Sequence, residues 1–161
     1  MSENAPVLVL GLGNILLKDE GVGVRVVEAL EARGGCPAGV ELLDGGTSGM
    51  DLIDQIGGRE VVVIVDALAT DEPPGTLVRL DGEQLDEGLH TRMSPHEVGL
   101  ADVLGLLRLM EASPGRVVLY GIVPASLDLG LELTEAGARG RDAAVSAIEA
   151  ELPMLAAIGA G

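Results

Sequence analysis

Continuous apolar runs alternate along this chain with longer stretches of helical periodicity. The run at 7–13 is apolar at successive positions, and the run at 60–65 has five consecutive apolar residues after Glu60. Such runs are typical of strands buried on both faces of a sheet. Residues 40–43 and 117–123 predict two further strands. Residues 76–80 alternate polar and apolar side chains after a Pro-Pro-Gly turn, which predicts an edge strand. This strand could run antiparallel to its neighbour.

Helices are predicted between these strands. In the first, Val22, Val26 and Leu30 recur at helical spacing, and the pair of glycines at 34 and 35 ends the segment. A proline at 153 is expected to break or kink the last helix. Residues 81–93 are expected to form an acidic loop. The predicted helices span 21–33, 50–56, 95–110 and 135–158.

Strands that alternate with helices predict an α/β fold. We expect a single-domain three-layer sandwich over residues 1–161, with a largely parallel, twisted sheet of about five strands and helices on both faces. The crossover connections should be right-handed. A length of 161 residues fits one domain, so one core and one functional site are expected.

The charge and cysteine content of the chain limit which partners and compartments are expected. The formal net charge of −16 argues against nucleic-acid binding, which depends on clustered basic residues. Solubility is the simplest reason for the acidity, and a basic partner surface is the alternative. No signal peptide is recognised, and no apolar run approaches the roughly 20 residues that span a bilayer. The single cysteine, Cys36, fits a reducing compartment, so a cytoplasmic location is expected.

Four side chains with metal-ligand or acid–base chemistry are expected at one edge of the sheet. Glu20, Asp44 and Asp66 lie in the segments that leave the first three strands, and His96 opens the helix after the fourth. Ligands of open α/β sheets bind beyond the carboxyl ends of the strands. Each position also has a purely structural interpretation.

The structural interpretations are those of helix and turn chemistry. Asp19 would cap the first helix, and Glu20 would complement its dipole. Asp44 precedes two glycines and would form a turn, whereas Asp66 would cap a loop. His96 would hydrogen-bond at a helix start. Position alone leaves these alternatives open.

The surroundings of His96 favour a neutral imidazole. Ser94 and Glu97 match a capping box with Pro95 at the first helical position, which places His96 in the first turn. The positive end of the helix dipole disfavours an imidazolium there, and a neutral ring keeps a lone pair for a metal. Two carboxylates and one imidazole would suit a first-row divalent ion.

Two other chemistries have weaker support. The segment from Gly11 to Gly13 begins like a dinucleotide fingerprint, but Leu16 stands at the third glycine and Glu20 lies where a pyrophosphate would need positive potential. The sequence has no Gly-x-Ser-x-Gly elbow that would present a nucleophilic serine. Cys36, the other candidate nucleophile, merely follows the predicted end of a helix.

Several motifs in one order closely resemble the hydrogenase maturation endopeptidases. They are GLGNILLKDEGVGVR at 11–25, DGGT at 44–47, VDA at 65–67, SPHEVGLAD at 94–102 and GIVP at 121–124. The likeness extends from about residue 7 to about residue 135 without large gaps, and none of the four candidate positions departs from the family pattern.

The resemblance implies an aspartic-type, nickel-dependent endopeptidase. Such an enzyme removes a C-terminal extension from the large-subunit precursor of a nickel-iron hydrogenase after nickel insertion. By the same resemblance, Glu20, Asp66 and His96 bind the metal, which arrives in the substrate as a recognition tag. Asp44 is implicated in activity, so the candidate catalytic residues are Asp44, Glu20 and Asp66.

Three other functions are open at this point. A non-cleaving chaperone for the nickel-loaded subunit would use the same site. A nucleotide-binding α/β module would be protected from thermal unfolding by its ligand. A purely oligomeric scaffold would tolerate substitution of the site residues; the oligomeric state is open.

Overall fold

A computed structural model of the chain describes residues 4–34, 36–82, 84–85 and 98–160. A five-stranded sheet forms its middle layer, in the order β2-β1-β3-β5-β4. The strands are β1 (Val7–Leu12), β2 (Val40–Gly46), β3 (Val61–Ala67), β4 (Leu77–Asp81) and β5 (Arg116–Ile122).

The strand order creates a switch point between β1 and β3. Strands β2, β1, β3 and β5 are parallel, and β4 pairs antiparallel with β5 at the edge. The chain passes from β1 to β2 on one side and then returns to β3 on the other. The carboxyl ends of β1 and β3 therefore flank a crevice of the kind in which open α/β sheets bind ligands.

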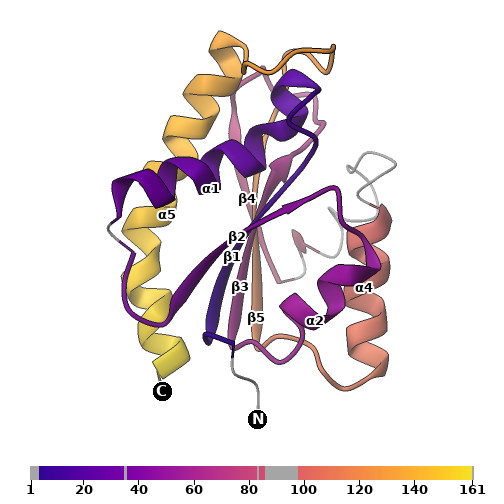
Figure 1. Cartoon of the computed structure of the whole chain (residues 1–161), viewed down its shortest axis with the longest axis vertical. Helices are drawn as coiled ribbons and strands as arrows, with labels where there is room; N and C mark the ends of the chain where they lie inside the picture. The colour runs from indigo at the N-terminus through magenta and orange to yellow at the C-terminus, as the bar shows by residue number, and fades with distance from the viewer. Residues whose placement is uncertain (1–3, 35, 83, 86–97, 161) are drawn as a thin grey trace.

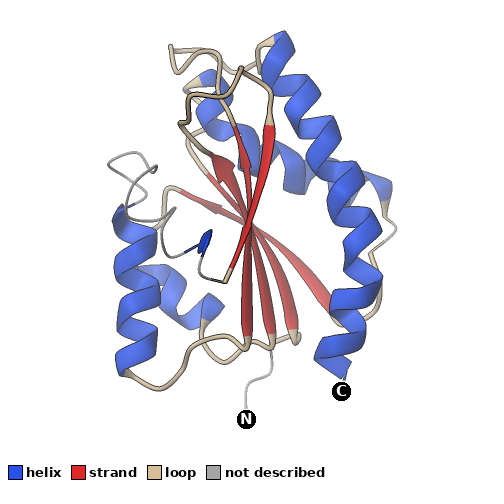
Figure 2. Ribbon diagram, turned by 180° about the vertical axis from the view of Figure 1, so that it is seen from behind, coloured by secondary structure: helices blue, strands red, loops and turns tan. Residues whose placement is uncertain are grey.

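Helices cover both faces of the sheet. Figures 1 and 2 show α1 and α5 on one face and α2 and α4 on the other. The helices are α1 (Val22–Arg33), α2 (Ile53–Ile56), α4 (Val98–Leu109) and α5 (Glu135–Ala160), with 3-10 turns η1 (Lys18–Gly21) and η2 (Met50–Leu52). The predicted fold class, a three-layer α/β sandwich with a largely parallel sheet, is confirmed.

The core consists of two aliphatic layers separated by the sheet. Successive strand side chains point to opposite faces, so Val7 and Val9 pack towards α1 and α5, whereas Leu8 and Leu10 pack towards α2 and α4. Every residue of β1 and β3 is buried. The continuous apolar runs predicted from the sequence thus lie in central strands covered on both faces.

Strand β2 is longer than the predicted 40–43. A register shift between Gly11 and Leu12 lets β1 pair with β2 as far as Gly46. Asp44 therefore lies within the strand, opposite Gly11, and not after its end. Asp66 is likewise the penultimate residue of β3.

The last helix is not broken at Pro153. Helix α5 runs through this position, although proline removes one hydrogen bond to the preceding turn. Leu152 and Leu155 are each only 1% exposed and anchor the helix in the core on both sides of the proline. Burial of this apolar face keeps the helix continuous, so the expected break does not occur. The alternative, a kink at Pro153, stays a prediction.

The expected acidic loop at 81–93 was partly wrong. Asp81 is the last residue of β4, and residues 84–85 are helical. Asp81 extends the strand because it pairs with Val118 of β5 and bonds to Arg116. Residues 83 and 86–93 lie outside the described residues, as do the first three positions of the helix predicted from 95.

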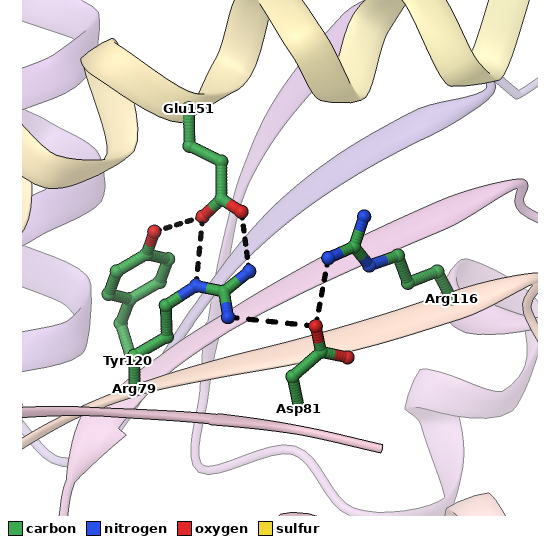
Figure 3. A network of polar contacts seen from close by, with 5 residues as sticks. All are labelled: Arg79, Asp81, Arg116, Tyr120 and Glu151. Carbon is green, nitrogen blue, oxygen red and sulfur yellow. Dashed lines mark hydrogen bonds and ion pairs between the residues drawn. The ribbon is translucent and has the colours of Figure 1, made fainter.

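A polar network fastens edge strand β4 to β5 and α5 (Figure 3). Glu151 of α5 accepts hydrogen bonds from the Tyr120 hydroxyl and from Arg79 Nε, the latter at 3.1 Å. Asp81 accepts a 2.8 Å bond from Arg116, and an Arg79 nitrogen lies 3.6 Å from the same carboxylate oxygen. Burial, followed by the bond to Glu151, raises the pKa of Tyr120 to about 12.

Within the described ranges, no helix has the length and apolar character needed to cross a membrane.

Candidate active site at the carboxyl edge of the sheet

The loop after β1 folds back tightly on itself and carries Glu20 into the crevice. Gly13 has a φ of +127°, and a Cβ added there would lie 1.9 Å from the Glu20 carbonyl oxygen. The 3-10 turn η1 closes through a 3.1 Å bond from Glu20 N to Leu17 O. Glycine at position 13 is therefore required for the path that positions Glu20.

Asp19 faces away from the crevice and fixes the loop from behind. Its carboxylate is fully buried and accepts hydrogen bonds from Ala125 N at 2.9 Å, Thr134 N at 2.9 Å and Thr134 Oγ1 at 2.6 Å. The interpretation that Asp19 caps the first helix was wrong, since α1 follows Gly21 without a side-chain cap. The carboxylate instead joins the first loop to the segment before α5.

Glu20 and Asp66 line the same small cavity. They are 6% and 5% exposed, and Asp66 Oδ1 accepts a 2.8 Å bond from Ala67 N. The cavity has a volume of about 40 Å³. Its other described walls are Leu12, Gly13, Gly46, Thr47, Ser48, Leu52 and Leu100. Two acidic side chains, one from η1 and one from the end of β3, thus line one cavity at the switch point between β1 and β3.

The burial of these two carboxyl groups is costly. A carboxylate removed from water needs hydrogen bonds or a cation to compensate for the lost solvation. Oxygen ligands from two different loops provide part of a coordination sphere for a divalent cation. The two carboxylates are therefore candidate ligands for a divalent cation.

Asp44 lies beside this cavity and not on its described walls. Its side chain is exposed, and Asp44 Oδ1 accepts a 2.9 Å bond from Gly46 N, so the turn chemistry expected of Asp-Gly-Gly is present. Asp44 lines an adjoining groove of about 380 Å³, which shares Gly13, Gly46 and Thr47 with the cavity. Asp44 and the Glu20–Asp66 pair therefore line adjoining hollows of the surface.

His96, together with the capping box of Ser94, Pro95 and Glu97, lies outside the described residues. Leu100, near the start of α4, does line the cavity, so this helix reaches the site from its amino-terminal part. Among the described residues, no group of three His, Cys, Asp or Glu side chains could hold a metal. The carboxylate pair supplies two candidate ligands.

Thr47 and Ser48 were missed as cavity residues by sequence reasoning. Both follow β2 and lie on the cavity wall beside Glu20 and Asp66. Thr47 is part of the DGGT motif, which was the only signal available. Its place at the wall depends on the register shift that extends β2.

Comparison with known proteins identifies the family. The family model of the hydrogenase maturation protease matches residues 24–151. The hydrogenase 2 maturation protease of Escherichia coli (strain K12) is 46% identical over 129 residues, which cover 80% of this chain and 79% of that protein. The chain belongs to the hydrogenase maturation protease family.

Solved structures of the family share the fold. The hydrogenase maturating endopeptidase HybD from E. coli superposes with a TM-score of 0.86 at 42% identity, covering 92% of each chain. The [NiFe] hydrogenase maturation protease HybD from Thermococcus kodakarensis gives a TM-score of 0.78 at 33% identity, covering 91% of this chain and 98% of that one. The family resemblance predicted from the sequence motifs is confirmed, and peptidase activity follows from it.

Proposed function

We propose that this chain is an endopeptidase that removes the C-terminal extension from the large-subunit precursor of a nickel-iron hydrogenase after nickel has been inserted. One observation carries the proposal: in a member of the hydrogenase maturation protease family, Glu20 and Asp66 share one cavity at the switch point of the sheet.

Nickel is part of the substrate in this proposal. The precursor presents its nickel to the oxygen atoms of Glu20 and Asp66 and to the imidazole of His96. Carboxylates and imidazole suit a divalent nickel ion that still has open coordination positions. Glu20 in η1 and Asp66 at the end of β3 lie at the carboxyl edge of the sheet, where a metal carried by the substrate can approach. Docking of the metal thus orients the bond to be cut.

Cleavage then requires an attacking water molecule. We assign Asp44 to assist this water, because it lies in the groove that continues from the Glu20–Asp66 cavity. A solvated carboxylate can accept the proton of a water molecule that adds to the peptide carbonyl. Nickel bound at the site would supply Lewis-acid polarisation of that carbonyl. With Asp44 in this role, the enzyme would be an aspartic-type endopeptidase.

The cytoplasm is the proposed location, since nickel insertion precedes cleavage and the single Cys36 fits a reducing compartment.

A product assay tests the function. The purified protein is incubated with nickel-loaded large-subunit precursor, and the precursor mass is followed by gel shift and mass spectrometry. Loss of one C-terminal peptide is the expected result. The main alternative, a chaperone that holds the nickel-loaded subunit without cutting it, predicts a stable complex and an unchanged precursor mass.

A further inference from the structure

Five large apolar side chains project into solvent at the same edge of the sheet as the candidate site. Two follow β1 and three precede α5, and we call them the apolar edge surface. They are Ile15 (36% exposed), Leu16 (54%), Leu127 (49%), Leu129 (81%) and Leu131 (61%). Groups of exposed apolar side chains mark interaction sites more often than single ones do.

The two loops that carry this surface are joined by backbone hydrogen bonds. Lys18 N donates to Gly130 O, and Gly130 N donates to Leu16 O, each at 2.9 Å. The Arg25 guanidinium of α1 also donates to Leu131 O at 2.8 Å. Figure 1 shows the orange segment before α5 beside the indigo turns that follow β1. The exposed leucines therefore lie on one ordered structure.

Asp19 strengthens this order from the inside. Its buried carboxylate binds Ala125 and Thr134, which flank the segment that contains the three leucines. A loop held in place before binding loses less conformational entropy when a partner docks. The chain thus stabilises an apolar surface that it does not bury.

The apolar edge surface continues into the candidate site. Ile15 and Leu16 line the groove that contains Asp44. That groove shares Gly13, Gly46 and Thr47 with the cavity of Glu20 and Asp66. One ligand chain can therefore contact the acidic cavity together with Ile15 and Leu16. The backbone bonds of Gly130 place the loop that carries the other three leucines beside Leu16.

We propose that the apolar edge surface binds apolar residues of the hydrogenase large-subunit precursor that flank the bond to be cut, while the nickel-bearing part of the precursor lies in the Glu20–Asp66 cavity. This inference rests on the proposed function. The continuity of groove and cavity selects the substrate as occupant, because any segment that enters the cavity along the groove passes Ile15 and Leu16.

A binding experiment with two matched double variants tests the inference. Leu129→Ser/Leu131→Ser removes the most exposed part of the surface. Leu109→Ser/Met154→Ser removes apolar groups of similar exposure, 84% and 52%, at the end of α4 and on α5. The Kd for immobilised nickel-loaded precursor is measured for each, alongside the cleavage rate. We expect the first variant to raise the Kd about tenfold or more and the control to leave it unchanged.

The two failures are distinguishable. An unchanged precursor mass with the unaltered protein contradicts the proposed function, and the Kd values still report on the surface. Equal Kd values for the unaltered protein and Leu129→Ser/Leu131→Ser overturn the inference. Sedimentation equilibrium measures the oligomeric state of the same variants. If Leu129→Ser/Leu131→Ser dissociates a homodimer and leaves the Kd unchanged, the surface binds a second copy of the chain and the inference is overturned. Unchanged melting temperatures of both variants show that folding is intact.

Discussion

The carboxylate of Asp19 accepts two hydrogen bonds from Thr134, a residue 115 positions further along the chain. These bonds join the loop after β1 to the start of α5. Glu20 is the next residue after Asp19, so its position depends on this long-range contact. The buried Asp19 thus supports both the candidate site and the apolar edge surface.

Replacement of Asp19 by asparagine is expected to destabilise the fold by about 2–4 kcal/mol. Asparagine has one acceptor oxygen in place of two, and its amide would face donors at Ala125 or Thr134. Urea unfolding followed by circular dichroism measures the change. Asp128→Asn, at an exposed position of the same segment, is the control and should stay within about 0.5 kcal/mol of the parent protein. Equal stability of the two variants would contradict the role given to Asp19.

Gly13→Ala is expected to abolish precursor processing and to destabilise the chain by about 2 kcal/mol or more. The new methyl group would collide with the Glu20 carbonyl at a φ that L-residues rarely adopt. Gly49→Ala is the control, because a Cβ there meets no atom within 4 Å. The assay compares cleavage rates and thermal unfolding. Normal processing by Gly13→Ala would show that the tight loop is not needed.

Glu20→Gln, Asp66→Asn and His96→Gln should each abolish processing. Each change removes a proposed ligand of the substrate's nickel. Glu20→Gln and Asp66→Asn keep the side-chain shape, whereas His96→Gln replaces the imidazole ring by an amide. We expect each change to alter the free energy of unfolding by no more than about 1 kcal/mol. For Glu20→Gln and Asp66→Asn the reason is that a neutral amide costs less to bury in the cavity than a carboxylate. Rate and stability are measured on the same preparations. A large loss of stability with retained cleavage would support structural roles instead.

Tyr120 should stay protonated in the folded protein well above the pH at which tyrosine usually ionises. Its pKa is raised from 10.0 to about 12, first by burial and then by the bond to Glu151. Stability from this group is fully present below pH 10 and is lost as pH rises towards 12. The chain has one tyrosine, so tyrosinate absorbance reports it directly.

Glu151→Gln is the matched test of that titration. The substitution removes the carboxylate that accepts the hydrogen bond of the Tyr120 hydroxyl. The pH midpoint of the tyrosinate absorbance should therefore fall towards 10. Circular dichroism at each pH confirms that the protein is folded. A midpoint near 10 in the unaltered protein would contradict the network of Figure 3.

The local pattern of the sequence predicted the fold well. The apolar residues from Val61 to Val65 predicted a fully buried strand, as the structure has it, and the edge position of β4 followed from its alternating residues. The alternation of strands and helices predicted that Glu20 and Asp66 share one edge of the sheet, and the structure finds them in one cavity. Strand ends that share an edge bring such residues together without further information.

Contacts between distant segments could not be predicted in this way. Asp19 adjoins Glu20 and has the same chemistry, yet its partner Thr134 has no signal in the first loop. The extension of β2 through Asp44 depends on a register shift in β1. The role of His96 stays a prediction, because it lies outside the described residues.

The nickel dependence of cleavage tests the central claim most directly. The unaltered protein is incubated with the same large-subunit precursor prepared with and without nickel, and the loss of the C-terminal peptide is timed by mass spectrometry. Cleavage of the nickel-loaded precursor alone is the predicted result, because the metal docks on Glu20, Asp66 and His96 to orient the bond. Cleavage of the nickel-free precursor at the full rate would contradict the account.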